Sequence, residues 1–244
     1  MLENKCILIT GATSGIGRHF AEYASRQGAT VVLVSRREER LKEIQDKVPG
    51  DCYIYPYDLY EIEHIRDIFD FVKKQGITLD ALVHCAGIEF GAPVRTIEAE
   101  DMEQVMRINA LSFVQLGRFF SMKKYSNKGA SVVAISSISS FLNPKGMIAY
   151  NTSKLAVNSA VFTMAKEFAS REIRVNAIAP ASVDTPMMQT AFKKIEGLKE
   201  QIIQDQYLGL IPPEQISYLI EFLLSERGKY ITGTVIPVSG GMPY

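Results

Sequence analysis

The sequence predicts an α/β fold, with one doubly wound parallel sheet of about seven strands and helices on both faces. Short apolar, β-branched runs alternate with helical patterns along most of the 244 residues, and this alternation is typical of parallel sheets. Several runs, such as TVVLVS at 30–35, are apolar nearly throughout instead of alternating. Continuous apolar runs of this length indicate strands that are covered on both faces.

Seven segments are predicted strands, and the six segments between them carry a helical pattern. The strands are predicted at 5–10, 30–35, 52–56, 81–85, 131–136, 174–179 and 234–239. The helices are predicted at 15–27, 37–48, 61–75, 98–127, 149–170 and 213–225. The last helix begins at a proline, a residue well suited to a first helical turn.

One irregular region, 180–212, lies between the sixth strand and the last helix. No segment has the composition of a linker and no repeat is visible, so residues 1–244 are predicted to form a single domain. Residues 187–212 are a candidate substrate lid with its apolar face inward, although such a stripe also fits a core helix. The apolar positions of the lid are Ala191, Phe192, Ile195, Leu198 and Ile202, and Phe90, Phe141 and Leu142 are candidates for the same pocket.

The charge balance and the hydropathy exclude several classes of function. Lysine plus arginine and aspartate plus glutamate number 27 each, so no strong field favours nucleic acid or an anionic membrane. No run of about 18 apolar residues is present, so no membrane span is predicted. The start, MLENKCILIT, carries an acid and runs directly into a strand, a pattern unlike a signal peptide.

The three cysteines, Cys6, Cys52 and Cys85, are scattered over predicted strands. An odd number without C-x-x-C spacing favours neither a disulfide framework nor a zinc site. We therefore interpret them as buried thiols, expect no metal, and predict a reducing, cytoplasmic compartment.

A glycine-rich turn joins the first strand to the first helix. The segment ITGATSGIGRHF places Gly11, Gly15 and Gly17 at this turn. Glycines let the backbone approach a ligand closely, and the helix N-terminus offers free N–H groups to an anion. The spacing is not G-x-G-x-x-G, and an ordinary tight turn is the alternative. The position, however, is the one where such sheets bind a pyrophosphate.

T-G-x-x-x-G-I-G at the N-terminus, together with Tyr150 and Lys154 in a Y-x-x-x-K pattern, resembles the short-chain dehydrogenase/reductase family. The segments 176–187 and 230–242 are similar to that family as well, so the likeness covers essentially the whole chain. The resemblance implies a Rossmann-like fold and hydride transfer between a nicotinamide cofactor and a small-molecule carbonyl or secondary alcohol, such as a ketone, a 3-oxoacyl thioester or a hydroxysteroid. Such members are typically tetramers, so a homotetramer or homodimer is expected.

The end of the second strand predicts which nicotinamide cofactor is bound. Enzymes that use NAD usually carry an acid about 20 residues after the glycine turn, but Ser35 stands there, followed by Arg36 and Arg37. A guanidinium binds a 2′-phosphate that a carboxylate would repel. We therefore predict NADP(H), with Arg36 as the main phosphate ligand. Two solvated arginines at the start of a charged helix are the alternative.

The resemblance implies further cofactor contacts. Asp58 matches an acceptor for the adenine amino group, although it also fits a helix N-cap. His84 and Cys85 depart from the family's usual asparagines, and Ala181 replaces its usual glycine. The contacts implied beyond Gly11, Gly15 and Gly17 are Thr13, Ser14, Ile16, Ser35, Arg36, Arg37, Asp58, Leu59, Ala86, Gly87, Tyr150, Lys154, Pro180, Val183 and Thr185.

Tyr150 and Lys154 lie four residues apart, so a helix places them on one face. A free phenol has a pKa of about 10, and bringing it to about 7 takes roughly 4 kcal/mol. One cation about 4 Å away at an effective dielectric near 20 supplies about that much. We therefore expect Lys154, with the charge of oxidised nicotinamide, to lower the pKa of Tyr150. An amphipathic helix showing both side chains to water is the alternative.

Two further residues complete the catalytic set that the resemblance implies. Ser137 matches the hydroxyl that holds the substrate oxygen, with Ser139 as the second candidate among four neighbouring serines. Asn109 is an unusual polar residue in an apolar helix and should have a partner; the family implies a proton path, and a helix–helix hydrogen bond is the alternative. A catalytically silent NADP(H)-binding sensor or scaffold is the rival function.

Two surface features depend on the predicted helices at 98–127 and 149–170. Phe113, Leu116, Gly117 and Phe120 fit either a subunit interface or the core. The basic cluster Arg118, Lys123, Lys124 and Lys128 fits either an acidic acyl carrier or a solvated helix end.

Overall fold

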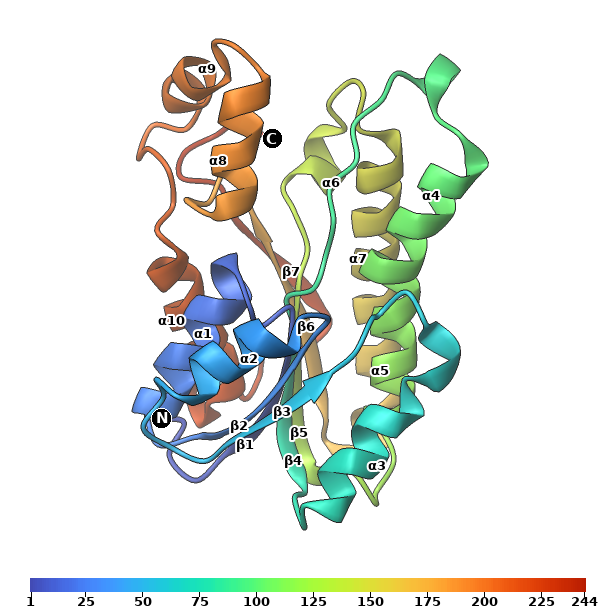
Figure 1. The fold of residues 1–244 in the computed structure, drawn as a ribbon, viewed down its shortest axis with the longest axis vertical. Coiled ribbons are helices and arrows are strands. Elements are labelled where there is room, and N and C mark those ends of the chain that lie inside the picture. The colour runs from blue at the N-terminus through green and yellow to red at the C-terminus, as the bar shows by residue number, and fades with distance from the viewer.

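A computed structural model describes residues 1–244, apart from the side chain of residue 194. One seven-stranded parallel sheet forms its centre, in the order β3-β2-β1-β4-β5-β6-β7 (Figure 1). The doubly wound parallel sheet predicted from the sequence is thereby confirmed. The strands are β1 (Cys6–Thr10), β2 (Thr30–Ser35), β3 (Cys52–Pro56), β4 (Leu79–His84), β5 (Ser126–Ile135), β6 (Arg174–Pro180) and β7 (Thr234–Val238).

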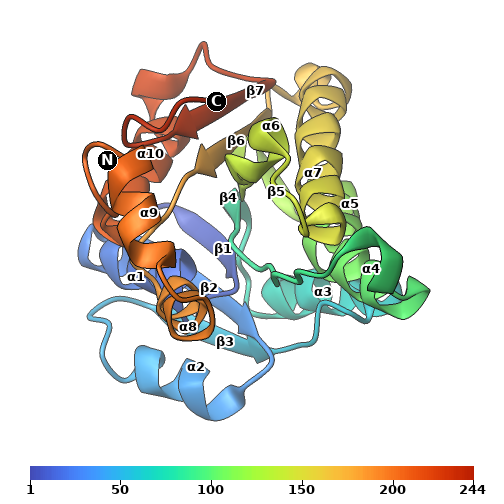
Figure 2. The ribbon, with the colours of Figure 1, turned by 90° about the horizontal axis from the view of Figure 1, so that it is seen from above.

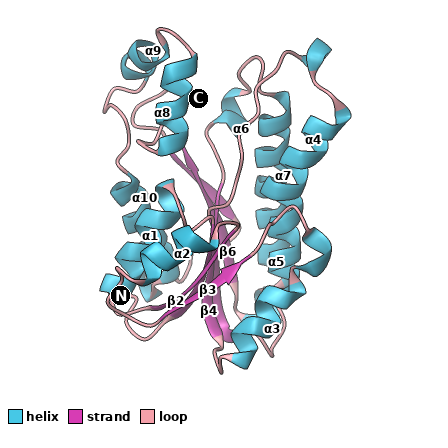
Figure 3. Cartoon of the chain, in the orientation of Figure 1, coloured by secondary structure: helices cyan, strands magenta, loops and turns pink.

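Helices cover both faces of the sheet (Figures 2 and 3). One layer contains α1 (Gly15–Arg26), α2 (Glu38–Gln45) and α10 (Pro213–Leu224). The other contains α3 (Arg66–Lys74), α4 (Ala99–Met106), α5 (Ser112–Phe120) and α7 (Ile148–Glu167). Three further helices, α6 (Ser139–Leu142), α8 (Pro186–Lys194) and α9 (Leu198–Asp205), lie beyond the carboxyl ends of the strands.

Two apolar clusters, one under each helix layer, make up the core. Alternate residues of each strand enter different clusters; in β2, Val32 packs with the α5 and α7 side and Leu33 with the α1 and α10 side. Both faces of the strands are therefore buried, which explains their continuous apolar runs. Phe113, Leu116 and Phe120 are fully buried in this core. An added Cβ at Gly117 would lie 2.7 Å from Met164, so these four residues do not form a subunit interface.

The chain order of the strands reverses between β1 and β4. Strands after β1 continue outward on one side as β2 and β3, and on the other side as β4 to β7. In open α/β sheets, ligands bind outside the carboxyl ends of the strands at such a reversal. We therefore expect a ligand site beside the segments that follow Thr10 and His84.

The helix predicted for 98–127 is wrong beyond residue 120. Phe120 ends α5, a turn follows, and Ser126 begins β5 by pairing with Leu79. Tyr125, fully buried, fixes this turn because its hydroxyl donates to the Asp70 carboxylate over 2.5 Å. The basic cluster around Lys124 and Lys128 therefore sits at the amino end of the sheet, opposite the carboxyl ends of the strands.

The candidate lid forms two helices instead of one continuous stripe. Gly197, at φ +74°, separates α8 from α9, and this left-handed conformation favours glycine. Ile202 is buried, whereas Ile195 is exposed and lines an open cavity with Ala191 and Met187, so the predicted apolar face is divided between the interior and a cavity wall. Within the described part of the chain, every helix is too short or too polar to span a membrane.

Candidate active site

The glycine turn brings the backbones of β1, α1 and β4 into close contact. Gly11 has φ +65°, and a Cβ there would lie 2.7 Å from the Ala86 nitrogen. A Cβ at Gly17 would lie 2.4 Å from the Gly11 carbonyl oxygen. Neither position has room for a side chain. Ser14, the N-cap of α1, makes no side-chain cap bond, and it lines the cleft at the N-terminus of this helix.

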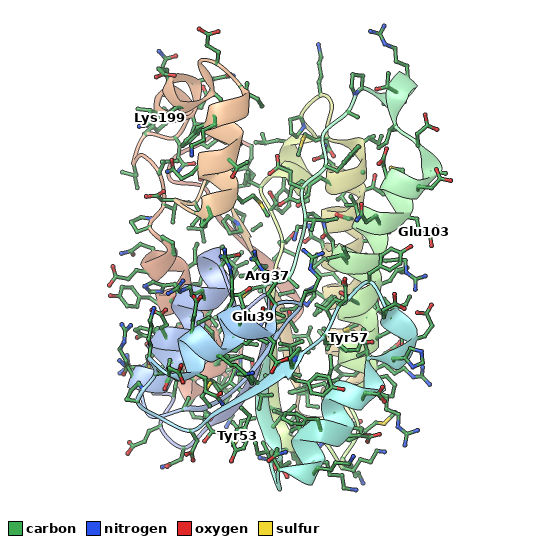
Figure 4. The ribbon with its side chains drawn as sticks, viewed as in Figure 1. Arg37, Glu39, Tyr53, Tyr57, Glu103 and Lys199 are labelled. Atoms are coloured by element: carbon green, nitrogen blue, oxygen red, sulfur yellow. The ribbon has the colours of Figure 1, made fainter. Side chains whose placement is uncertain are left out.

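A cavity of about 140 Å³ begins at this turn and extends over the ends of β2 and β3. Within its wall, Thr13 and Ser35 share a hydrogen bond of 2.8 Å between their hydroxyls. The Arg36 guanidinium, exposed at the rim, lies 4.0 Å from the Asp58 carboxylate. Arg37 opens α2 beside them, and Tyr57 follows β3 (Figure 4). The predicted residues in this wall are Gly11, Thr13, Ser14, Ser35, Arg36, Arg37, Asp58, Leu59, Ala86 and Gly87.

Asp58 caps a turn and not a helix. Its carboxylate accepts a hydrogen bond from the Tyr60 N–H over 3.0 Å, while Glu61 is the N-cap of the short helical turn that follows. The helix N-cap interpretation of Asp58 is therefore wrong. Its other carboxylate oxygen faces Arg36 at the cavity rim.

A second cavity, of about 280 Å³, continues from the glycine turn toward the ends of β5 and β6. The two cavities share Gly11, Ser14, Ala86 and Gly87, so together they form one cleft across the carboxyl ends of the strands. The remaining predicted residues of this wall are Gly15, Ile16, Gly17, Ser137, Tyr150, Lys154, Pro180, Val183 and Thr185. Of the predicted site residues, Asn109 lies behind the wall.

The segment after β5 presents its four serines in different directions. Ser137 hydrogen-bonds with the Tyr150 side chain and accepts from the Ser139 N–H over 3.1 Å. Ser136 instead donates to Asn158 over 2.6 Å, and Ser140 donates to the Ser137 carbonyl over 2.7 Å. The serine predicted from family spacing is therefore the one whose hydroxyl meets the tyrosine.

Tyr150 and Lys154 both face the cleft from α7, but Lys154 does not lower the pKa of Tyr150. Burial raises the pKa of Tyr150 to about 12, with the Ser137 hydrogen bond opposing this rise and the Glu89 charge adding to it. The Lys154 ammonium donates to the Ile135 carbonyl over 2.8 Å and lies 5.6 Å from the centre of the tyrosine ring. The predicted acidic phenol is therefore wrong for the protein alone, because desolvation of the phenolate dominates.

Lys154 is itself strongly affected by its surroundings. The side chain is 4% exposed, and burial lowers the pKa of Lys154 to about 8. A buried ammonium with a pKa near working pH is a typical mark of a functional site.

Asn109 sits in a π-helical turn, Arg107–Leu111, between α4 and α5. Such turns are rare and are frequent at functional sites. The side chain is fully buried, and it accepts from the Ile88 N–H over 2.8 Å and donates to the Ser153 hydroxyl over 2.9 Å. The buried amide therefore has the hydrogen-bond partners that its burial predicted, one in the segment after β4 and one in α7.

Sequence reasoning missed several residues of the wall, and misplaced others. Met147, Met187 and Met188 supply apolar surface to the second cavity, although nothing in their spacing distinguishes them. Phe90, Phe141 and Leu142 do not line it; Phe141 is exposed and packs against the Tyr244 ring, 5.7 Å away. Ala181 adopts no left-handed backbone conformation, so its Cβ is accommodated without strain.

Comparisons with known proteins agree with this geometry. The family model described as enoyl-(acyl carrier protein) reductase matches residues 11–243. The chain is 31% identical to the 3-oxoacyl-(acyl-carrier-protein) reductase FabG of Thermotoga maritima, over 99% of this chain and 98% of that one. It is 32% identical to a glucose 1-dehydrogenase of Gluconobacter oxydans, over 98% and 91% of the two chains.

A solved structure extends the likeness to a ligand complex. The 7α-hydroxysteroid dehydrogenase complexed with NADH and 7-oxo glycochenodeoxycholic acid superposes with a TM-score of 0.92 at 27% identity, over 99% of this chain and 95% of that one. The protein is accordingly an oxidoreductase that acts on carbonyl or alcohol groups with a nicotinamide dinucleotide. The chain belongs to the short-chain dehydrogenase/reductase family.

Proposed function

We propose that the protein is an NADP(H)-dependent ketone reductase in which Tyr150 donates the proton. The observation that carries the proposal is the meeting of Ser137, Tyr150 and Lys154 in one cavity that continues into the glycine-lined cavity at Arg36. A phenol, a hydroxyl and an ammonium in one partly open cavity provide a proton donor and hydrogen-bond donors for a carbonyl oxygen.

The residues of the cleft fit a dinucleotide. Gly11 and Gly17 have no space for a Cβ, the N-terminus of α1 offers backbone N–H groups to a diphosphate, and Arg36 stands at the end of β2. When bound, the nicotinamide supplies or accepts the hydride. Val183 and Thr185, in the wall of the second cavity, would hold its carboxamide.

The chain's own groups would divide the work on the substrate oxygen. Ser137 would hold the carbonyl oxygen beside Tyr150, and the neutral phenol would donate its proton to the developing alkoxide. Lys154 keeps a positive charge at the face of the phenol ring, and Asn109 fixes the loop at Ile88 that borders both groups.

Turnover tests the proposal directly. NADPH absorbance should fall when the protein meets one of three carbonyl classes: an acetoacetyl thioester, a 7-oxo bile acid or a simple aldose. We expect turnover of the thioester or the oxosteroid, because Met147, Met187 and Met188 make this end of the cavity apolar. NADPH binding without turnover of any of the three would instead indicate a catalytically silent binding protein.

Replacing Arg36 by alanine should weaken NADPH binding about tenfold to a hundredfold. A charge-assisted guanidinium–phosphate contact contributes about 1.5–3 kcal/mol, whereas NADH has no 2′-phosphate and its dissociation constant should change less than threefold. Fluorescence titration measures both constants. Arg26→Ala, which removes an exposed arginine at the far end of α1, is the matched control. Tighter binding of NADH than NADPH by the unaltered protein would contradict the NADP(H) assignment.

We propose that residues 187–212 act as a lid over the substrate. Both ends are anchored: Thr185 caps α8, and the Gln206 side chain bonds with the Ser182 backbone at 2.9 and 3.1 Å. Between the anchors, Met187 and Met188 reach the cavity while Ile195 and Ile203 are exposed. With NADPH bound, added oxosteroid or thioester should slow amide hydrogen exchange in 187–206 at least threefold. Exchange in α10 should not change, and unchanged exchange in 187–206 would contradict the lid.

A homodimer or homotetramer is also proposed, through the two predicted helical regions 98–127 and 149–170 but with other residues than those first named. Leu111, Val114, Leu155 and Phe162 are 39–46% exposed on α5, α7 and the π-helical turn. Apolar side chains gathered on outer helix faces support association between copies of the chain. The cytoplasmic location stays a prediction from the cysteine pattern.

A further inference from the structure

His84 is a buried polar residue that the proposed mechanism does not use. It ends β4, where its register partner on β1 is Thr10. The side chain is 1% exposed, its ring stacks on Phe113 with centres 5.4 Å apart, and its Nε2 has no hydrogen-bond partner among the described residues. Burying an imidazole nitrogen without a hydrogen-bond partner costs free energy, so we expect the residue to have a compensating role.

The other ring nitrogen connects His84 to the loop under the nicotinamide end of the cleft. Nδ1 lies 2.9 Å from the Thr10 hydroxyl, and the same hydroxyl accepts from the Ala86 N–H over 3.4 Å. Because the hydroxyl accepts from Ala86, its own hydrogen is available to Nδ1. One side chain thus links the end of β4 to the start of the Ala86–Gly87 segment through Thr10.

The Ala86–Gly87 segment in turn borders the catalytic groups. A Cβ at Gly87 would lie 3.3 Å from the Lys154 nitrogen and 3.4 Å from the Asn109 side-chain oxygen. Asn109 also holds the next residue, because it bonds with both backbone groups of Ile88 at 2.8 and 2.9 Å. The backbone of this segment therefore forms the surface that Lys154 and Asn109 face, and it has little room for a larger residue at Gly87.

His84 stays uncharged in this setting. Burial lowers the pKa of His84 to about 3, and the charge of Lys154 lowers it further, while the backbone of Asn109 acts in the opposite direction. A neutral imidazole can sit beside the Lys154 ammonium without repelling it. It lines neither cavity of the cleft, so it is not placed to act as a general base on a bound substrate.

We propose that His84 is a positioning residue that acts through Thr10 to fix the Ala86–Gly87 segment against Lys154 and Asn109. This inference rests on the proposed function for its kinetic readout. It also predicts local backbone rigidity that does not depend on turnover.

His84→Phe keeps the ring stack on Phe113 and removes the bond to Thr10. We expect kcat for the best carbonyl substrate of the panel to fall at least tenfold while its KM stays within threefold. Amide hydrogen exchange at 85–88, measured on the free protein, should quicken at least tenfold. His84→Asn, which restores an amide able to bond with Thr10, should return kcat to within threefold of the unaltered protein.

Two more variants separate positioning from packing. Phe113→Leu removes the stacking partner and leaves the bond to Thr10, so it should lower Tm without changing kcat more than threefold. Thr10→Val removes the hydroxyl and with it the contacts to both His84 and the Ala86 N–H, so it should lower kcat at least as much as His84→Phe, and the double variant should be no slower than Thr10→Val. If His84→Phe does not fold, the same measurements on Thr10→Val test the proposal.

The inference is overturned if exchange at 85–88 is unchanged in His84→Phe or Thr10→Val, or if their kinetic losses add in the double variant. An unaltered protein that turns over no carbonyl compound would refute the proposed function. The exchange measurement would still decide the role of His84.

Discussion

Tyr150→Phe should lower kcat about 10²- to 10⁴-fold, the range that a positioned general acid contributes. The substitution removes one oxygen and keeps the ring, so the contact between the ring and the Lys154 ammonium persists. NADPH affinity should stay within threefold, and Tm should change little, because Tyr150 is half-buried in the cavity wall, where solvent can replace its hydroxyl beside Ser137. Steady-state kinetics, fluorescence titration and thermal unfolding together measure the three quantities.

Tyr55→Phe is the matched control for this substitution. Tyr55 packs on Phe71 with ring centres 4.9 Å apart, on the sheet and away from the two cavities, so kcat should be unchanged. Ser137→Ala should cost about 10²- to 10³-fold, as expected for a donor to a developing oxyanion, and Ser139→Ala less than tenfold. Retention of more than a tenth of the activity in Tyr150→Phe would refute the role of the phenol.

The strands were predictable because their burial on two faces leaves a local signal. Leu33 and Val34 in β2 belong to opposite clusters, so every position had to be apolar. The first part of β5 gave no such signal. Asn127, Lys128 and Gly129 are exposed, and they fall in an irregularity of the β4–β5 pairing, which passes from Leu79–Ser126 to Ala81–Ser131.

The candidate site was likewise predictable where local spacing decides the arrangement, and not where residues distant in the sequence decide it. Helical spacing placed Tyr150 and Lys154 on one face, and this is what α7 shows. The pKa values of both groups depend on burial. The Lys154 ammonium also donates to the carbonyl of Ile135, a residue of β5. The contact between His84 and Thr10 joins residues 74 positions apart, so no local pattern could have indicated it.

Lys154→Met should abolish most activity and yet raise stability. The pKa of Lys154 is lowered by burial from 10.5 to about 8, so keeping its charge in the folded protein at pH 7 costs about 3 kcal/mol. Methionine removes that cost and leaves the Ile135 carbonyl without its donor, which costs about 1–2 kcal/mol. The net gain of about 1–2 kcal/mol corresponds to a rise in Tm of roughly 2–8 °C for a chain of this size.

Thermal unfolding at pH 7 measures this rise, and Lys166→Met, an exposed lysine on the same helix, should shift Tm by no more than about 2 °C. The kinetic loss should be at least about a hundredfold, because the positive charge near Tyr150 is gone. A lower Tm in Lys154→Met than in the unaltered protein would show that the ammonium stabilises the fold.

The difference in free energy of unfolding between Lys154→Met and the unaltered protein should depend on pH, because proton binding is linked to folding. Between pH 8 and 10.5 the folded protein releases the Lys154 proton while the unfolded chain retains it. The unfolded state then binds more protons, so the stability of the unaltered protein rises with pH across this window. Lys154→Met lacks this titration, and its advantage in free energy of unfolding should therefore shrink from pH 8 upward and vanish between about pH 9 and 10. An advantage that stays constant from pH 7 to 10 would mean that Lys154 has an ordinary pKa, and that burial does not strain the charge on which the proposed chemistry depends.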